Sequence, residues 1–363
     1  MTLSDHDSQI SVRDVKKGAI INEFEGSYLH NWTMDSAGQY IAFTGYTVSE
    51  NQSSVGAFEA IPNGKEWAKL IANSKGSSFE GSALAFRPMK TTFAIALGVR
   101  KSPVTERDKM IRFFDAKNGD EVLSLRGEGP ILSISFNESG GLLAAGEGPK
   151  ADQVAQNPQI EVISGGPGAF GPLGKEEEPS SGIVEVWDLT TNSVVYRIEH
   201  DGPVEKCLFL GDKELLTFAR GVIRVWSLTP KPAVIFQTKV SWTPNQFQKV
   251  GDILLGLLGD GIVHLWDVHL GREIGRLAHG GQIERFSLSS DGQLIATASD
   301  DGTARIWRMR FEELERIGCR DLRMSYLEEN LQKLSEEVLE GESISNTDCA
   351  GEEVVRGKSD ASP

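Results

Sequence analysis

The chain has 363 residues, of which 39 are glycine, and hydrophobic residues make up 39% of it. No apolar run approaches the roughly 20 residues that a membrane-spanning helix needs, so we expect no membrane partner. The net charge of −15 comes without a cluster of Lys and Arg. This argues against nucleic acid as a direct ligand, because such binding depends on neutralising phosphates.

The start of the chain has neither a basic region nor an apolar core, so no secretory signal is visible. Its three cysteines, Cys207, Cys319 and Cys349, are far apart and give no disulfide or zinc framework. We therefore expect a cytoplasmic location and a protein or peptide partner.

A short alternating motif recurs from QISVRD at residues 9–14 to ARIWRM at residues 304–309. Spacings of about 40 to 45 residues are typical of a four-stranded propeller blade. Each unit also contains four short alternating segments, which predict strands. The aromatic position of the motif falls at Arg13, Phe58, Phe114, Trp187, Trp226, Trp266 and Trp307, with spacings of 45, 56, 73, 39, 40 and 41 residues.

Three units are lengthened between their second and third predicted strands, near residues 46–54, at 99–109 and at 148–182. In a propeller such connections emerge on one face, and long loops in a compact domain are often binding elements. The alternative is that long loops are tolerated because closure entropy grows slowly with length. The Gly-rich stretch within 148–182 lacks the ending of a phosphate-binding loop.

Aromatic and Arg side chains often anchor protein interfaces, which suggests candidates for partner binding. Trp242 and Phe170 have no place in the repeat, although Trp242 also fits a packing role that seals a blade. Trp67 and Arg107 are the weaker candidates.

After Trp307 the hydrophobic period changes. Residues 311–340 carry leucines at helical spacing, which predicts a helical extension that either docks on the propeller edge or meets a partner helix. Residues 341–363 are small, polar and acidic, which predicts a disordered tail. The predicted domain plan is thus a propeller over residues 1–310 followed by these two segments.

The repeat resembles the WD40-repeat β-propeller family over about residues 5–309. In that family a His, a Ser or Thr, an Asp and the Trp of one blade form a buried hydrogen-bond network, with the Asp six residues before the Trp. His279, Ser299, Asp301 and Trp307 stand at those positions here. The resemblance therefore implies that these four residues are structural.

Earlier units keep less of this pattern. His200 retains the His position, and Asp260, Asp108 and Asp7 retain the Asp position, whereas Arg220, Ser181 and Gln52 replace the Asp. The segment with Gly318, Cys319, Leu322, Tyr326 and Leu327 is also similar to the helical ending found after WD40 propellers in multidomain bacterial proteins.

The number of blades stays open at this point. The chain opens on a third-strand motif, and counting gives seven third strands but six first, second and fourth strands. We favour seven blades with an incomplete or shared N-terminal blade; the alternative is six blades, with residues 19–25 closing the last one. Because open strand edges invite pairing, either N-terminal residues close the ring or the chain is the downstream part of a longer polypeptide.

Catalytic motifs such as Gly-x-Ser-x-Gly and His-Glu-x-x-His are absent, and the six histidines are dispersed. We therefore predict no catalytic residues, no metal and no cofactor. The predicted function is a non-catalytic interaction scaffold, with a regulatory or assembly role, that binds a protein or peptide through its loop-bearing face. The alternative is a propeller enzyme, a hydrolase or quinone-type dehydrogenase, with a site at the central channel.

Overall fold

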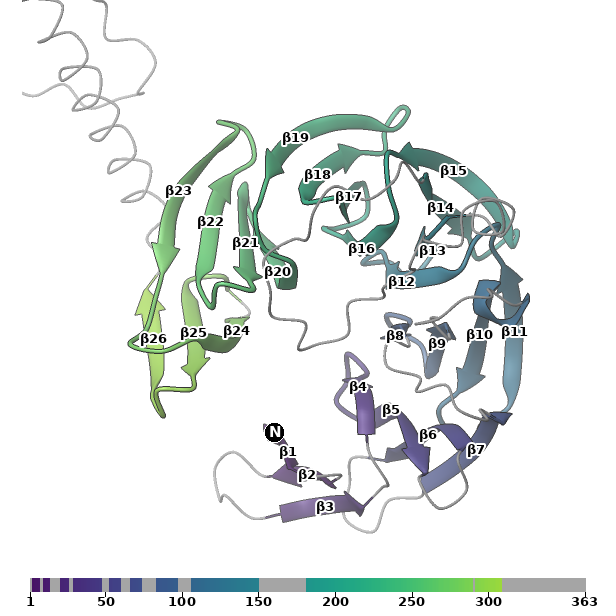
Figure 1. The fold of residues 1–363 in the computed structure, drawn as a ribbon. Coiled ribbons are helices and arrows are strands. Elements are labelled where there is room, and N and C mark those ends of the chain that lie inside the picture. Colours follow the sequence, from purple (N-terminus) through teal and green to yellow (C-terminus); the bar gives the residue numbers. More distant parts are fainter. Residues whose placement is uncertain are drawn as a thin grey trace, which may run out of the picture. The chain divides into compact units, whose positions relative to one another are not determined.

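The computed structural model describes residues 2–6, 9–13, 20–25, 29–47, 52–59, 66–73, 83–96, 106–149, 181–289 and 291–308. These residues form strands β1 to β26 and a short 3-10 helix, η1 (Glu106–Lys109), as Figure 1 shows. Within them no helix is long and apolar enough to cross a membrane. The predicted helical extension and tail lie outside the described residues.

The strands form seven sheets, numbered here in chain order. Sheet 1 has three strands, β1 (Thr2–His6), β2 (Gln9–Arg13) and β3 (Ile20–Glu25). Sheet 7 also has three strands, β24 (Ile283–Leu288), β25 (Leu294–Ser299) and β26 (Ala304–Arg308). Sheet 2 contains β4 (Leu29–Met34), β5 (Tyr40–Thr47), β6 (Gln52–Glu59) and β7 (Glu66–Asn73). Sheet 3 contains β8 (Ala83–Phe86), β9 (Thr92–Ala96), β10 (Met110–Asp115) and β11 (Glu121–Arg126). Sheet 4 contains β12 (Ile131–Phe136), β13 (Leu142–Glu147), β14 (Gly182–Asp188) and β15 (Ser193–His200). Sheet 5 contains β16 (Val204–Phe209), β17 (Glu214–Ala219), β18 (Val222–Ser227) and β19 (Ala233–Lys239). Sheet 6 contains β20 (Pro244–Val250), β21 (Ile253–Leu258), β22 (Val263–Asp267) and β23 (Arg272–Leu277).

Within every sheet the strands follow one another in chain order. Repeated four-stranded meanders of this kind are the blades of a β-propeller, which confirms the predicted all-β fold class. Two details differ from the sequence analysis. Residues 20–25 pair with 9–13 inside sheet 1 and do not extend the last sheet. The chain also does not open on a third strand, because β1 precedes β2 and pairs with it; its sequence TLSDH has one apolar residue and hence no visible alternation.

The turn from the third to the fourth strand explains why an Asp follows the aromatic position. Asp188 Oδ1 accepts the N–H of Thr190 at 2.7 Å, and Asp267 Oδ1 accepts the N–H two residues further on at 2.9 Å. Four residues after each Asp, the chain has a positive φ, 55° at Asn192 and 68° at Gly271. Asn and Gly tolerate this left-handed conformation, so the pattern Asp-x-x-x-Asn/Gly reverses the chain locally.

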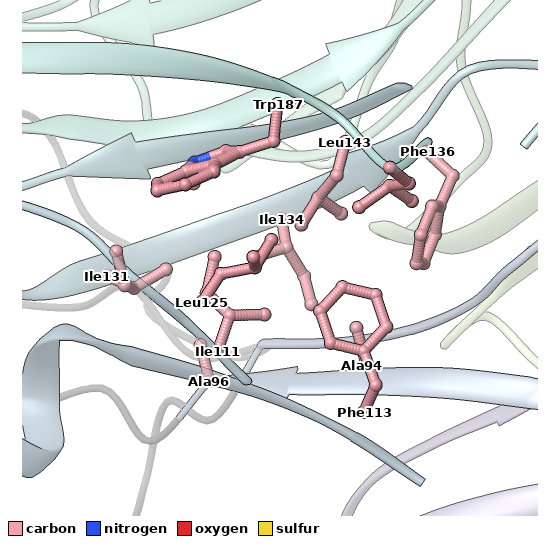
Figure 2. Close-up of a cluster of buried hydrophobic side chains, with 12 residues drawn as sticks. Ala94, Ala96, Ile111, Phe113, Leu125, Ile131, Ile134, Phe136, Leu143 and Trp187 are labelled. Carbon is pink, nitrogen blue, oxygen red and sulfur yellow. The ribbon is translucent and has the colours of Figure 1, made fainter. Parts of the chain in front are cut away.

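Neighbouring sheets share hydrophobic cores, because alternation directs every second side chain of a strand to one face. Figure 2 shows the core between sheets 3 and 4, where the rings of Phe113 and Phe136 meet edge to face, 6.1 Å apart. Ile111, Ile131 and Leu143 of the same cluster are fully buried. Comparable clusters join sheet 2 to sheet 3, sheet 4 to sheet 5, and sheet 5 to sheet 6.

Candidate functional site

The loop-bearing edge is the end of each sheet where the second strand leads to the third and the fourth strand leads to the next sheet. In an antiparallel meander both connections leave the same end. Long second-to-third connections occur in the consecutive sheets 3 and 4, and their residues 97–105 and 150–180 lie outside the described residues. The insertion predicted near residues 46–54 is mostly strand, because β5 and β6 pair as far as Thr47 and Gln52 and leave only residues 48–51 between them.

Backbone hydrogen bonds tie the roots of two insertions together. The N–H of Gly127 donates to the Lys109 carbonyl at 2.9 Å, and the N–H of Gly148 donates to the Pro130 carbonyl at 2.8 Å. Lys109 ends the connection into β10, and Gly148 begins the connection out of β13. Lys109 and Gly148, at the ends of the two connections, are therefore both bonded to one short segment, residues 127–130.

The same edge carries a buried hydrogen-bond chain in sheet 5. Trp226 Nε1–H donates to Thr217 Oγ1 at 2.9 Å, and Thr217 Oγ1 lies 2.9 Å from His200 Nε2. His200 Nδ1 lies 3.2 Å from the Ile198 carbonyl. All groups are satisfied if the Thr217 hydroxyl donates to a neutral His200, whose Nδ1–H then donates to Ile198. Burial lowers the pKa of His200 to about 4, in agreement with the neutral ring.

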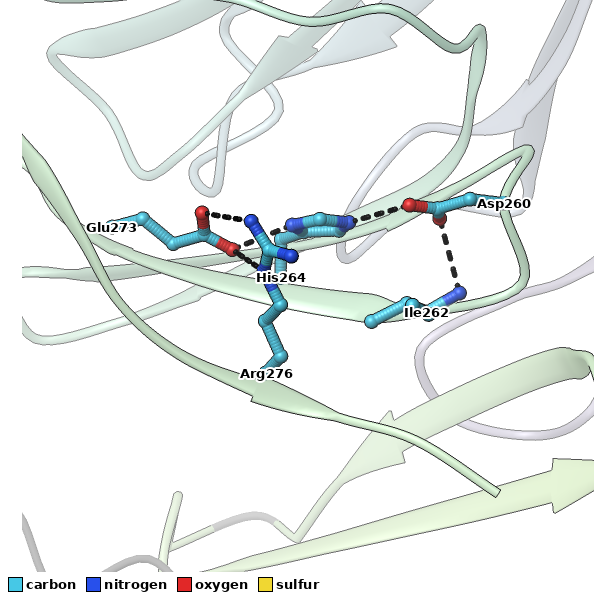
Figure 3. Close-up of polar contacts among 5 residues, drawn as sticks. All are labelled: Asp260, Ile262, His264, Glu273 and Arg276. Atoms are coloured by element: carbon cyan, nitrogen blue, oxygen red, sulfur yellow. Dashed lines mark hydrogen bonds and ion pairs between the residues drawn. The ribbon is translucent and has the colours of Figure 1, made fainter. Parts of the chain in front are cut away.

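Sheet 6 builds a different network around Asp260, as Figure 3 shows. His264 Nε2 lies 3.0 Å from Asp260 Oδ2, and His264 Nδ1 lies 2.6 Å from Glu273 Oε1. Glu273 also binds two nitrogens of the Arg276 guanidinium, at 2.6 and 2.8 Å. Hydrogen bonds from Arg276 and His264 lower the pKa of Glu273. This sheet has Val240 near the position of His200, and His264 on β22 supplies the imidazole instead.

In sheet 7 His279 contacts two threonines and Asp301. His279 Nε2 lies 2.7 Å from Thr297 Oγ1, and its Nδ1 lies 3.1 Å from Thr303 Oγ1 and 3.4 Å from Asp301 Oδ2. Thr297, and not Ser299, is therefore the hydroxyl that meets the imidazole. Both side chains lie on one face of β25, but Ser299 is at the turn, where its Oγ accepts the Asp301 N–H at 3.2 Å.

Asp301 organises the rest of this turn. Its Oδ1 accepts the N–H and the hydroxyl of Thr303 at 2.8 and 2.6 Å, and its Oδ2 accepts the Gly280 N–H at 3.1 Å. These bonds, the Thr303 hydroxyl first, lower the pKa of Asp301. Trp307 is half-buried on β26, with the Arg305 guanidinium 5.9 Å from its ring centroid. Asp301 thus orders this turn locally, and a hydrogen-bond network that includes Trp307 stays a prediction.

The residue two positions before the repeat aromatic forms a further recurring contact. The Arg112 guanidinium lies 5.1 Å from the centre of the Phe114 ring, and the His264 ring stacks on Trp266 at 5.5 Å. Sheet 5 has Arg224 at this position and sheet 7 has Arg305. Sheet 4 is different, because it carries Glu185 there.

The four residues predicted to bind a partner lie in different parts of the chain. Trp242 lies in the connection from β19 to β20, on the loop-bearing edge, and packs half-buried against the core of sheets 5 and 6. Trp67 is opposite Ala57 on β7, and Arg107 is in η1. Phe170 lies outside the described residues. Their role in partner binding stays a prediction.

Sequence reasoning missed a buried acidic pair at the root of the longest insertion. Glu147 ends β13 with 0% exposure, and Glu185 on β14 has 1%. The available signal was the acid at residue 185, where four other repeats carry Arg or His. Burial, and then the charge of Glu185, raise the pKa of Glu147. Among the residues that the structure describes, no three His, Cys, Asp or Glu side chains are grouped to hold a metal ion.

Known proteins resemble this chain in sequence and in fold. The family model "WD domain, G-beta repeat" matches residues 271–308, the sheet 6 to sheet 7 region with the best-preserved motif. A chain in the crystal structure of the mitotic checkpoint complex aligns with a TM-score of 0.56 and 14% identity, over 83% of this chain and 82% of that one. At this identity the likeness shows the fold alone. The chain therefore has a β-propeller fold, and its residues 271–308 match a WD repeat.

Two curated relatives align with more than half of this chain. The serine-threonine kinase receptor-associated protein of Rattus norvegicus is 23% identical over 221 residues, which cover 57% of this chain and 63% of the relative. The angio-associated migratory cell protein of Homo sapiens is 23% identical over 253 residues, which cover 68% of this chain and 54% of the relative. The chain thus matches less than two thirds of the length of either protein.

Proposed function

We propose that this propeller is a non-catalytic scaffold of the cytoplasm, with a regulatory or assembly role, that binds a protein or peptide through the loop-bearing edge at sheets 3 and 4. The observation that carries the proposal is the placement of two long connections on consecutive sheets, both rooted on the shared segment 127–130. The first relative is named for association with a receptor, which is a protein partner.

The physical basis is a rigid support beneath variable loops. The buried cores and the backbone bonds at residues 109, 127, 130 and 148 fix where the insertions leave the sheets. The base of the loops is then already in place for binding, which lowers the entropic cost of association. Sequence can vary in such loops without disturbing the packing of the sheets.

The test replaces residues 150–180 with a short turn of the same sequence as Asp300–Thr303 in sheet 7. Quantitative affinity purification of the full chain and this variant should show loss of specific partners, while the melting temperature changes little. A matched control substitutes Lys231, which lies in the exposed turn between β18 and β19, with Ala and should keep the partners. An unchanged set of partners after loop replacement would refute binding through this insertion.

The enzyme alternative makes a different prediction. It requires an activity that is lost when acidic groups of the innermost strands are neutralised and that survives replacement of residues 150–180. Activity screening with hydrolase and quinone-reductase substrates on both proteins separates the two functions.

A further inference from the structure

The carboxyl groups of Glu147 and Glu185 meet inside sheet 4. Glu147 is opposite Ile183 in the β13–β14 ladder, and Glu185 is opposite Ala145, so the two acids are diagonal neighbours on one face. Both are almost fully buried, and the Glu185 carboxylate is within hydrogen-bonding reach of Glu147. The equivalent second-strand residues in sheets 5 and 6 are the uncharged Ala219 and Leu258.

The two oxygens of Glu147 have different surroundings. Oε2 accepts the backbone N–H of Glu128 at 3.0 Å and that of Gly129 at 2.6 Å. Oε1 is buried and has no hydrogen-bond partner if both acids are ionised, because two carboxylates offer only acceptors. A proton on Oε1 removes this conflict, since Oε1–H then donates to Glu185.

The charged groups around the pair favour one proton between them. Arg197 on β15 pairs with Glu185 at 2.5 Å and with Glu128 at 2.7 Å, so it compensates these two charges. It adds only a longer-range attraction to Glu147. From β16 the buried Cys207 faces Glu147, and burial raises the pKa of that thiol to about 12, so it stays neutral. One cation therefore faces three carboxyl groups.

We propose that Glu147 and Glu185 share one proton, and that loss of this proton releases the segment 127–130 and loosens the common base of the two long insertions. The link is physical: the oxygen that holds the Glu128 and Gly129 amides belongs to the carboxyl group that would gain a second, uncompensated charge beside Glu185. Repulsion between two buried carboxylates is relieved by moving one of them towards solvent. The pair is thus a pH-sensitive element at the loop-bearing edge.

The sign of the effect follows from proton linkage. The native state keeps a proton that the unfolded chain releases once the pH exceeds the usual pKa of glutamate. The pair therefore contributes most to stability below that pH, and its contribution falls as the pH rises through neutrality. One extra bound proton changes the unfolding equilibrium constant by up to about tenfold per pH unit. This dependence ends once Glu147 is ionised in the native state as well.

The test compares denaturant unfolding of the full chain and of Glu147→Gln from mildly acidic to alkaline pH. Gln keeps an acceptor for the two amides and donates to Glu185, so it imitates the protonated acid at every pH. The unfolding constant of the unaltered chain should rise with pH relative to that of the variant by up to about tenfold per unit. Glu199→Gln, an exposed acid on β15 of the same sheet, should follow the unaltered chain.

Parallel pH profiles for the unaltered chain and Glu147→Gln would overturn the proposal. Hydrogen exchange supplies a second readout: protection of the Glu128 and Gly129 amides should fall at alkaline pH in the unaltered chain, beyond the intrinsic base effect, and persist in the variant. If Glu147→Gln does not fold, Glu185→Gln is expected to remove the same pH dependence. If neither folds, infrared spectroscopy of the unaltered chain decides, because a missing protonated-carboxyl band at neutral pH refutes the shared proton.

The consequence of this element for partner binding rests on the proposed scaffold function. None of the three readouts uses a partner, so the two hypotheses fail separately. If stability depends on pH as expected but loop replacement removes no binding partner, the shared proton stands and the scaffold function is refuted. If loop replacement removes partners but stability shows no such pH dependence, the scaffold function stands and the shared proton is refuted.

Discussion

The Thr217 hydroxyl is the link on which the sheet 5 network depends, because it accepts from Trp226 and donates to His200. The cross-strand register places the same position at Ala145 in sheet 4 and Gly256 in sheet 6. Without a hydroxyl there, Trp187 Nε1 in sheet 4 is buried and has no hydrogen-bond partner.

Thr217→Val should destabilise the protein by about 1–3 kcal/mol, because it leaves His200 and the Trp226 N–H without their shared partner in a buried site. Denaturant unfolding followed by tryptophan fluorescence measures the change. Thr217→Ser keeps the hydroxyl and should lose less. A smaller loss for Val, which keeps the methyl group, than for Ser, which lacks it, would show that the methyl contact outweighs the hydrogen bonds.

Within a single sheet, the packing of sheet 6 requires a glycine, which has no side chain. A Cβ atom at Gly256 on β21 would lie 2.7 Å from Trp266 Cζ3 and 2.8 Å from Phe247 Cε1, both in rings of the buried core. Gly275 on β23 has no atom within 4 Å of the same point. The position that holds a hydroxyl in sheet 5 thus admits two aromatic rings in sheet 6.

Gly256→Ala should therefore destabilise the chain by about 1–3 kcal/mol through overpacking. Gly275→Ala is the matched control, since it adds the same methyl group to open space. It should be neutral or stabilise by up to about 1 kcal/mol, because Ala lowers the entropy of the unfolded chain. Comparable losses for both variants in thermal unfolding would contradict the packing argument.

At the scale of the molecule, side chains on the first strand of one sheet bind the backbone of the next first strand. Ser133 Oγ on β12 accepts the N–H of Cys207 on β16 at 3.0 Å. Gln246 on β20 binds both backbone groups of Phe286 on β24, at 2.7 and 3.2 Å. Outer backbone groups of an edge strand lack a ladder partner, so these bonds satisfy them and join neighbouring sheets.

Gln246→Met keeps the side-chain length but removes both bonds to Phe286. We expect a loss of about 1–3 kcal/mol and faster hydrogen exchange at the Phe286 amide. Gln237→Met, on the exposed face of β19, should change neither. Unaltered exchange at Phe286 in the Gln246 variant would show that the amide is protected by other contacts.

For the part of the chain that the structure describes, alternation in the sequence was enough to predict the number and type of strands to within one, because alternation is a local property. It also indicated the long connections of sheets 3 and 4, whereas in sheet 2 the expected insertion is mostly strand. Only the tertiary structure decided which hydroxyl meets His279, that residues 20–25 pair with β2, and that Glu147 meets Glu185. Each of these depends on cross-strand register and burial, which bring together residues with no fixed spacing along the chain.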